Sequence, residues 1–243
     1  MSSKEQRLRE YIFSLPQSEL KDKPDKILEA IDKFSEKEHL MNIGQKKGNL
    51  VVSKMGDTKV MAELGGYMGY SAIKFAAALP SDGKYYSFEV NEEFANIARD
   101  LIKLAGLSDK IEIILGEAKD TLLEFSEAQN RPKKFDAVFI DHWKTQYTPD
   151  LRTLESLGLI GPGTVVMADN TLVPGAPEYL EYIRMSPEDK KNFIRDHANP
   201  NGTQYPGRWD IQWQNESFQF DLTRGDHTVT DAVEVSRFVK YQD

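Results

Sequence analysis

Four chemically different side chains stand in a row directly after an apolar run of the chain. Asp141, His142, Trp143 and Lys144 follow residues 137–140, which read as the end of a buried strand. A strand end needs no carboxylate, imidazole, indole and ammonium group side by side in order to fold. We therefore interpret the row as part of a site, with a core tryptophan and a surface lysine as the alternatives.

A polar pair also follows the next apolar run. Asp169 and Asn170 close the stretch 163–170. Ligands of an open α/β sheet bind beyond the carboxyl ends of its strands, so this pair should lie close to Asp141. Two carboxylates and an amide are hard oxygen ligands that suit Mg²⁺, whereas zinc favours cysteine and histidine. We predict a Mg²⁺ site here; a helix cap and a turn are the alternatives.

Lys144 lies three residues beyond Asp141. A nearby divalent cation and partial burial both disfavour the charged form of a lysine, so Lys144 is a candidate general base. A surface lysine, or a salt bridge to Asp169, would explain the same residue without catalysis. Trp143 offers a flat apolar face to an adenine or an aryl ring.

A glycine-rich turn follows the first predicted strand. Gly65, Gly66 and Gly69 let a ligand approach the backbone closely, and Glu89, at the end of the second predicted strand, could accept hydrogen bonds from a ribose. Tyr67 is bulky where the pyrophosphate of NAD would need room, and Glu63 would repel that pyrophosphate. The turn therefore favours S-adenosylmethionine. A plain strand-to-helix turn and an exposed strand-end acid are the alternatives.

From Thr58 onward, short apolar stretches alternate with amphipathic ones, which indicates a parallel, doubly wound α/β sheet. Predicted strands cover 59–64, 84–90, 110–116, 135–141 and 163–170, and predicted helices cover 71–79, 91–107, 118–130, 149–160 and 176–185.

The two ends of the chain have a different pattern. Amphipathic helices are predicted over 3–16 and from 24 to about 37, and a third begins near Gln45. Residues 187–210 are polar and rich in Pro, Gly and Asn, which indicates a loop or lid. The stretches 214–224 and 231–241 are typical of an antiparallel edge hairpin.

We expect one domain over residues 1–243. Cap helices would occupy 1–57, the cofactor- and metal-binding core 58–185, and a substrate-side loop with the hairpin 186–243.

The net charge of −8 argues against a general nucleic-acid binder, and the absence of cysteine excludes disulfides, thiolate metal sites and a cysteine nucleophile. We expect neither a signal peptide nor a membrane span, because the N-terminal residues carry mixed charge and no apolar run reaches 18 residues. We expect a cytoplasmic monomer that acts on a small molecule.

Several motifs together resemble the catechol O-methyltransferase family of class I methyltransferases. They are MNIGQKKG (41–48), ELGGYMGYSA (63–72), FIDHWKTQYTPD (139–150) and GTVVMADNTLVPGAPEYL (163–180). The resemblance runs from about Glu5 to Arg184. It implies a Rossmann-like methyltransferase sheet of seven strands with the last one antiparallel, S-adenosylmethionine as cofactor, Mg²⁺, and a catechol substrate.

The resemblance also implies roles for individual residues. The methionine end of the cofactor would lie near Met41, Ile43, Glu63, Gly65, Tyr67 and Ser71, and its ribose would bind Glu89. The adenine would lie among Val90, Glu117, Ala118, Lys119, His142 and Trp143, with Asp141 also next to the cofactor. Mg²⁺ would bind Asp141, Asp169 and Asn170, and the catechol would contact Asp141, Lys144, Asn170, Pro174 and His39. Lys144 would remove a hydroxyl proton before the oxygen attacks the methyl group by SN2.

The chain departs from the family in places. Ala118 and Lys119 replace a Ser-Gln pair beside the adenine, and His39 stands where a tryptophan walls the catechol. A glutamate that orients the second hydroxyl has no clear counterpart; Asp221 and Asp226 are candidates. Tyr205, Trp209 and Trp213 could supply aromatic walls or pack within their own loop.

Two other functions remain open from the sequence. One is an NAD(P)-dependent oxidoreductase, against which Tyr67 and the incomplete glycine pattern argue. The other is a non-catalytic nucleoside-binding domain, which would not need Lys144 beside three metal ligands.

Overall fold

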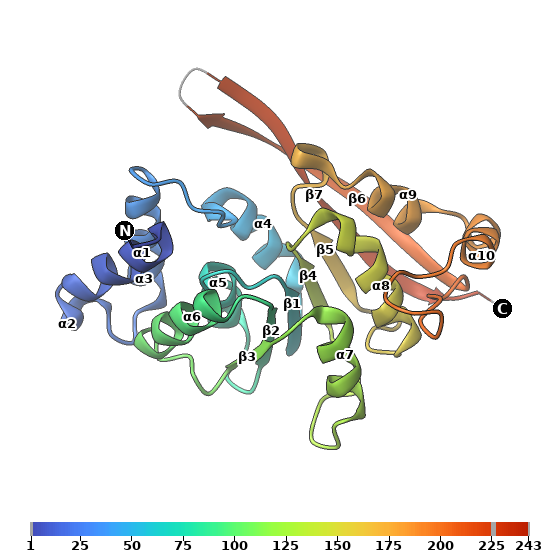
Figure 1. The fold of residues 1–243 in the computed structure, drawn as a ribbon, viewed down its shortest axis with the longest axis horizontal. Helices are drawn as coiled ribbons and strands as arrows, with labels where there is room; N and C mark the ends of the chain where they lie inside the picture. The colour runs from blue at the N-terminus through green and yellow to red at the C-terminus, as the bar shows by residue number, and fades with distance from the viewer. Residues whose placement is uncertain (1, 225–226, 243) are drawn as a thin grey trace. The chain divides into compact units, whose positions relative to one another are not determined.

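Strands and helices alternate from Val60 to Ala168 in the computed structural model, which describes residues 2–224 and 227–242 (Figure 1). Seven strands form one sheet in the order β3-β2-β1-β4-β5-β7-β6. The pairs β1–β4, β2–β3 and β4–β5 are parallel, and β5–β7 and β6–β7 are antiparallel. The predicted fold class, a mostly parallel α/β sheet with an antiparallel C-terminal hairpin, is confirmed.

Contacts along the chain define two units. Unit 1 comprises Met1–Lys59 and Gly65–Glu117, and unit 2 comprises Val60–Leu64 and Ala118–Asp243. Unit 1 contains α1 (Lys4–Ser14), α2 (Gln17–Leu20), α3 (Pro24–Ser35), α4 (Gly44–Met55), α5 (Tyr70–Ala78), β2 (Lys84–Glu89), α6 (Glu92–Leu104) and β3 (Ile111–Leu115). Unit 2 contains β1 (Val60–Leu64), α7 (Ala118–Glu127), β4 (Ala137–Ile140), η1 (Lys144–Gln146), α8 (Tyr147–Ser156), β5 (Val165–Ala168), η2 (Thr171–Gly175), α9 (Pro177–Arg184), α10 (Pro187–Asp196), β6 (Ile211–Arg224) and β7 (His227–Tyr241).

The helices α1 and α6 of unit 1 begin at side-chain caps that the sequence supplies. Ser3 and Gln6 form a reciprocal capping box at the start of α1, and Asn91 accepts a hydrogen bond from the Phe94 amide at the start of α6. The predicted apolar stripe of α3, which includes Ile27, is buried.

Gly69 shows why the turn before α5 needs glycine. Its φ of +82° lies in the left-handed region, and a Cβ atom placed there would lie 3.1 Å from the Cβ of Ala98 on α6. A side chain at this position would push α6 away from the turn.

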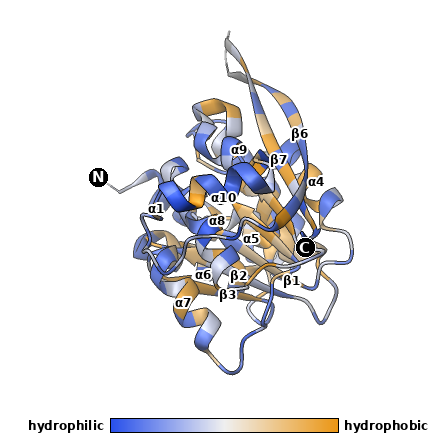
Figure 2. Ribbon diagram, turned by 90° about the vertical axis from the view of Figure 1, so that its right-hand side faces the viewer, coloured by the Kyte–Doolittle hydropathy of each residue, from blue (hydrophilic) through white to orange (hydrophobic). Residues whose placement is uncertain are grey.

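The central strands of unit 2 are buried on both faces, which explains their continuous apolar sequence. All residues of β4 and most of β5 are inaccessible to solvent. The β6–β7 hairpin is longer than the rest of the sheet: β5 pairs with β7 only over residues 234–237 (Figure 1). Hydrophobic and hydrophilic residues alternate along both hairpin strands (Figure 2).

The structure also corrects some predicted elements. Residues Pro187–Asp196 form the helix α10 rather than a loop, and β7 begins at His227 rather than at residue 231. The short helix α2 was not predicted. Among the described helices, none has the length and apolar character needed to cross a membrane.

Candidate functional site

The glycine turn of unit 1 is built around the carboxylate of Glu89. Glu89 Oε2 accepts a hydrogen bond of 2.7 Å from the Tyr67 amide, and Oε1 accepts one of 2.8 Å from the Asn91 amide. Tyr67 has a φ of +45° and Gly65 a φ of +94°, so the backbone bends sharply before α5. The sequence predicted that this turn and Glu89 lie together, and the structure places them in contact.

Glu89 is buried, with 6% of its surface exposed. Burial raises the pKa of Glu89, although backbone amides, including those of Asn91 and Tyr67, oppose this shift. A ligand hydroxyl that donates to this carboxylate would stabilise its ionised form.

The side chain of Tyr67 is anchored by a residue that the sequence reasoning missed. Its hydroxyl donates a 2.7 Å hydrogen bond to Oε1 of Glu5 on α1. Burial, and then the hydrogen bond to Glu5, raise the pKa of the Tyr67 phenol, which therefore stays protonated as the donor. The signal in the sequence is weak, since Glu5 is one acid among many in an amphipathic helix.

The other predicted residues of unit 1 differ in their exposure. Met41 and Val90 are apolar yet 58% and 56% exposed, as expected for side chains that a ligand could cover. Ile43 and Ser71 are buried. His39 and Glu117 are exposed, and the His39 carbonyl accepts a hydrogen bond from Lys4.

The carboxyl ends of β4 and β5 bring the predicted metal ligands of unit 2 together. Ile140 pairs with Ala168 in the parallel register, so Asp141 and Asp169 are the next residues of adjacent strands. Asn170 has a φ of +55°, and its amide donates to Oδ1 of Asp169 over 2.8 Å. This turn sets the side chain of Asn170 beside that of Lys144.

Lys144 faces two of these ligands. Its Nζ lies 3.2 Å from Oδ1 of Asp141 and 3.3 Å from Oδ1 of Asn170. Nζ also donates to the hydroxyl of Tyr147, whose own proton points to the carbonyl of Asp169 over 3.1 Å. Of the two aspartates, Asp141 forms an ion pair with Lys144.

Tyr147 is a second residue that the sequence reasoning missed. It is fully buried, and burial followed by the charges of Asp141 and Asp169 raises the pKa of its phenol. The neutral phenol can therefore accept from Lys144 and donate to a carbonyl at the same time. Its position three residues after Lys144, about one helical turn, was the available signal.

His142 and Trp143 point to different surroundings. Nε2 of His142 lies 2.6 Å from Oδ2 of Asp150, and its ring stacks on Tyr147. Trp143 is 77% exposed, so the alternative of a core tryptophan is wrong. Ala118 and Lys119, at the start of α7, are partly exposed.

Glu63 and Pro174 complete the predicted residues of unit 2. Glu63, on β1, is fully buried. Pro174 is exposed in the turn η2 and follows a cis peptide bond from Val173. Leu172 and Val173 in the same turn are each 42% exposed.

Asp231 on β7 is the third residue that the sequence reasoning missed. It is fully buried, and its Oδ2 accepts a 2.8 Å hydrogen bond from Nδ2 of Asn170. Of the two acids considered from the sequence, Asp221 is exposed and accepts from Thr230, and Asp226 lies outside the described residues. The acid beside Asn170 is therefore a different one.

The donor set fits a hard cation. Asp141 and Asn170 direct oxygens toward one positive group, the Lys144 ammonium, and Asp169 is the adjacent carboxylate. In the part of the chain that the structure describes, no three His, Cys, Asp or Glu side chains form a metal-binding group by themselves. The Mg²⁺ prediction depends on counting the amide oxygen of Asn170 as a ligand.

The polar segment after α10 is tied to α8. Arg152 donates to the carbonyls of His197 and Pro206 over 2.7 and 2.9 Å. Asn201 donates to Oδ1 of Asp150 over 2.6 Å. The segment thereby reaches the carboxylate that holds His142.

The aromatic residues of this region pack locally. Tyr205 is buried, Lys191 lies 4.8 Å from the ring of Trp209, and Trp213 packs on Phe238. These contacts favour the alternative in which the three residues pack within their own region.

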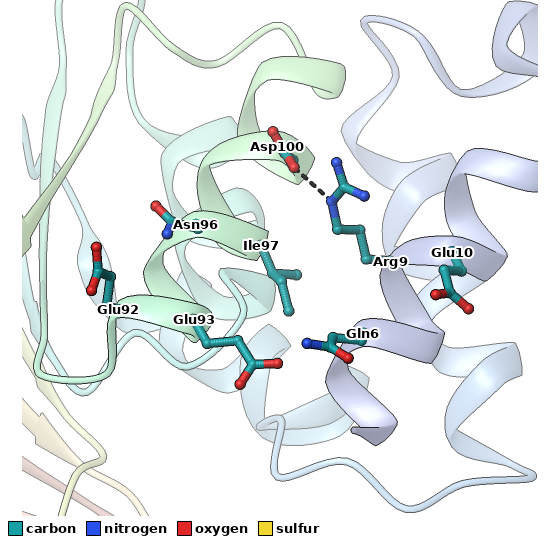
Figure 3. Close-up of a pocket in the computed structure, with 8 residues that line it drawn as sticks. All are labelled: Gln6, Arg9, Glu10, Glu92, Glu93, Asn96, Ile97 and Asp100. Atoms are coloured by element: carbon teal, nitrogen blue, oxygen red, sulfur yellow. Dashed lines mark hydrogen bonds and ion pairs between the residues drawn. The ribbon is translucent and has the colours of Figure 1, made fainter. Parts of the chain in front are cut away.

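A groove on unit 1 lies between α1 and α6 (Figure 3). Arg9 crosses it to Asp100 over 2.7 Å, and Glu10, Glu92 and Glu93 make its lining acidic. It contains none of the predicted site residues.

Sequence comparisons agree with the motifs. The model of the O-methyltransferase family matches residues 19–184, more than half of the chain. Catechol O-methyltransferase of Bos taurus is 39% identical over 186 residues, which cover 75% of this chain and 67% of the relative. Catechol O-methyltransferase B of Danio rerio is 38% identical over 200 residues, which cover 81% and 74%.

Solved structures share the fold. An O-methyltransferase from Bacillus cereus in complex with SAH has a TM-score of 0.57 and 22% identity, covering 96% of this chain and 97% of that one. The O-methyltransferase TomG from Streptomyces achromogenes in complex with SAM has a TM-score of 0.58 and 22% identity, covering 98% and 100%. At these identities the likeness concerns the fold alone.

Proposed function

Because the chain belongs to the O-methyltransferase family, we propose that it methylates one hydroxyl of a catechol, with S-adenosylmethionine as methyl donor and Mg²⁺ as cofactor. The observation that carries the proposal is the ammonium of Lys144, which faces oxygens of Asp141 and Asn170 at two adjacent strand ends. The two vertebrate relatives are catechol O-methyltransferases, and this supports a catechol as the substrate.

In this proposal the residues of unit 1 bind much of the methyl donor. Glu89 accepts hydrogen bonds from the ribose hydroxyls, because its carboxylate is fixed by the Tyr67 and Asn91 amides. Gly65 lets the methionine end approach the backbone, and the exposed apolar side chains of Met41 and Val90 are covered by ligand. The remaining contacts are those implied by the family resemblance.

Asp141, Asp169 and Asn170 would hold Mg²⁺. When bound, the ion would supply positive charge beside the two catechol oxygens, which favours loss of a proton from one of them. Pro174, with the neighbouring Leu172 and Val173, would line one side of the catechol ring.

Lys144 acts as the general base. As the free amine it takes the proton of one catechol hydroxyl, and the resulting phenolate oxygen attacks the methyl carbon in line. The new O–C bond forms as the C–S bond breaks, and the electron pair of that bond returns to sulfur as a neutral thioether. Tyr147 holds Lys144 in place during this step through its hydroxyl.

The rival functions have less support. A pyrophosphate of NAD(P) would approach the Tyr67 backbone, whose amide already donates to Glu89. A non-catalytic binding domain would not need Lys144 directed at two metal-ligating oxygens. A monomeric, cytoplasmic protein with one methyltransferase domain and no nucleic-acid partner remains our expectation.

A methyl-transfer assay tests the proposal. The full chain is incubated with S-adenosylmethionine and 3,4-dihydroxybenzoate, once with Mg²⁺ and once with EDTA. We expect the monomethyl ether only with Mg²⁺. Cofactor binding without transfer to a panel of small catechols would contradict the proposed substrate class, and equal transfer in EDTA would contradict the metal requirement.

A further inference from the structure

Asp231 is a buried carboxylate to which the proposed chemistry assigns no role. It lies on β7, far along the chain from the strand ends that carry the proposed metal ligands, and none of its surface is exposed. Burying a carboxylate without hydrogen-bond partners costs folding free energy. The partners of Asp231 therefore indicate its role.

The two oxygens of Asp231 have different partners. Oδ1 accepts from the backbone amides of Val173, Ala232 and Leu172, over 2.9, 2.8 and 3.3 Å. Oδ2 accepts from Nδ2 of Asn170 over 2.8 Å. The backbone amides fix the orientation of the carboxylate, and its second oxygen is thereby aimed at Asn170.

The chemistry of the pair fixes which way the Asn170 amide points. An ionised carboxylate can only accept hydrogen bonds, so the group of Asn170 that faces Asp231 must be the NH₂. The carbonyl Oδ1 then faces the opposite way, toward Nζ of Lys144 at 3.3 Å. A reversed amide would set its oxygen against the carboxylate and its NH₂ against an ammonium.

We propose that Asp231 is a positioning residue that holds the Asn170 amide with its oxygen toward the metal-binding side of the strand ends. The inference rests on the proposed function, in which Asn170 is a Mg²⁺ ligand. In this assignment Asp231 acts through Asn170, to which its Oδ2 is hydrogen-bonded. Its role is to prevent the amide from presenting NH₂ to a cation.

Asp231→Asn is an informative variant because it keeps the shape and reverses one polarity. The backbone amides of Val173 and Ala232 would still select the oxygen of the new side chain, so its NH₂ would face Asn170. Two NH₂ groups cannot hydrogen-bond to each other, and Asn170 would turn its oxygen inward. A cation at the strand ends would then face the NH₂ group of Asn170 instead of its carbonyl oxygen.

The double variant Asn170→Asp, Asp231→Asn restores the polarity. The amide at position 231 donates to one oxygen of the carboxylate at position 170, and the other oxygen faces the cation. Asp221→Asn is the matched control, because it makes the same change on the same hairpin at an exposed residue that accepts from Thr230.

The experiment measures Mn²⁺ binding to the full chain by electron paramagnetic resonance, with Mg²⁺ as competitor. We expect Asp231→Asn to weaken metal affinity about 10- to 100-fold, as is typical for residues that orient a ligand. We expect the double variant to recover most of the loss and Asp221→Asn to bind as the wild type. The affinity for S-adenosylmethionine, measured by calorimetry, should change less than about threefold.

Each other result has a defined meaning. Wild-type affinity in folded Asp231→Asn overturns the positioning role but leaves the proposed function intact. A wild-type chain that binds no metal overturns the proposed metal site and this inference with it. If Asp231→Asn does not fold, the double variant decides: metal affinity near that of the wild type supports the role, and its loss overturns it.

Discussion

At the scale of single residues, the structure gives Lys144 a defined setting. An oxygen of Asp141, an oxygen of Asn170 and the Tyr147 hydroxyl all contact its Nζ, and the side chain lies over the Tyr147 ring. These contacts hold the amine at the ends of β4 and β5, where a general base is required by the proposed reaction.

Lys144→Met should therefore abolish most of the activity while the protein stays folded. Methionine keeps much of the aliphatic length but cannot take a proton, so we expect kcat to fall by about 10²- to 10⁴-fold. Steady-state methyl transfer measures this loss. Lys134→Met, at an exposed lysine bound to the Pro162 carbonyl, is the control and should retain wild-type turnover. Unchanged turnover in Lys144→Met would exclude Lys144 as the base.

Glu89→Gln should weaken cofactor binding and change its dependence on pH. Glutamine keeps one acceptor oxygen but loses the charge, so we expect about a tenfold higher Kd for S-adenosylmethionine at pH 7. Burial raises the pKa of Glu89, so the wild type should lose affinity on acidification at a pH above about 4.3, the ordinary glutamate value. Calorimetric titrations across pH 5–8 measure both effects. A similar pH profile in the variant would show that another group is responsible.

The raised pKa of Glu89 also makes the stability of the ligand-free chain depend on pH. Acidification weakens cofactor binding but favours the folded state. A carboxyl group whose pKa is raised by folding contributes stability that is present below its unfolded-state value and is lost as pH rises through the folded-state value. Glu89→Gln cannot titrate, so the ligand-free variant should gain stability relative to the wild type as the pH rises through that window. Urea unfolding of the ligand-free proteins is the corresponding measurement.

At the scale of elements, α10 is attached to α8 through a buried charge pair. Nζ of Lys190 lies 3.6 Å from Oε1 of Glu155, and neither side chain is exposed. Glu155 Oε2 also accepts from the Tyr182 hydroxyl and the Arg208 amide, over 2.6 and 2.9 Å. Burial lowers the pKa of Lys190, and Glu155 opposes that shift.

Lys190→Met should destabilise the chain because it leaves the Glu155 carboxylate buried without its counter-charge. Losing one partner of such a pair costs about 3–5 kcal/mol of unfolding free energy. The double variant with Glu155→Gln should recover most of this loss, since the amide oxygen can still accept from Tyr182 and Arg208. Urea unfolding gives the values. Lys191→Met, at the exposed neighbour packed over Trp209, should cost less than about 1 kcal/mol. No recovery in the double variant would contradict an electrostatic origin.

This helix also shows where sequence reasoning failed. Residues 186–196 are polar except for Phe193 and Ile194, and Lys190 is the buried residue of α10, so no apolar stripe marks a helix. The signal was at the N-terminus: Ser186 caps the helix, Pro187 follows, and Glu188 and Asp189 occupy the first turn. The strands of the sheet were predictable because their apolar runs are short and regularly spaced.

At the scale of the whole molecule, strand order determines which parts of the site the sequence reveals. Asp141 and Asp169 follow neighbouring parallel strands and could be paired from the sequence, since both strand ends face the same edge. The contact between Asp231 and Asn170 could not be predicted from the sequence. It depends on the antiparallel pairing of β7 with β5, and the register of that pairing is set by packing. The hydrogen bond between Tyr67 and Glu5 could not be predicted either, because it depends on the packing of α1, which no local sequence pattern encodes.

Ligand binding should stabilise the whole chain, and this separates the methyl-transfer proposal from the nicotinamide alternative. A ligand that binds only the folded state adds about 2.7 kcal/mol at 100 times its Kd, and each kcal/mol raises Tm by about 2–4 °C for a chain of this size. S-adenosylhomocysteine, which keeps the ribose that Glu89 is positioned to bind, should therefore raise Tm by roughly 5–10 °C, whereas NADH should leave it unchanged. Thermal unfolding followed by circular dichroism measures both, with Glu89→Gln as the variant whose shift at the same ligand concentration should be smaller. A shift with NADH and none with S-adenosylhomocysteine would reverse the assignment, because the bulky Tyr67 turn would then accommodate a pyrophosphate.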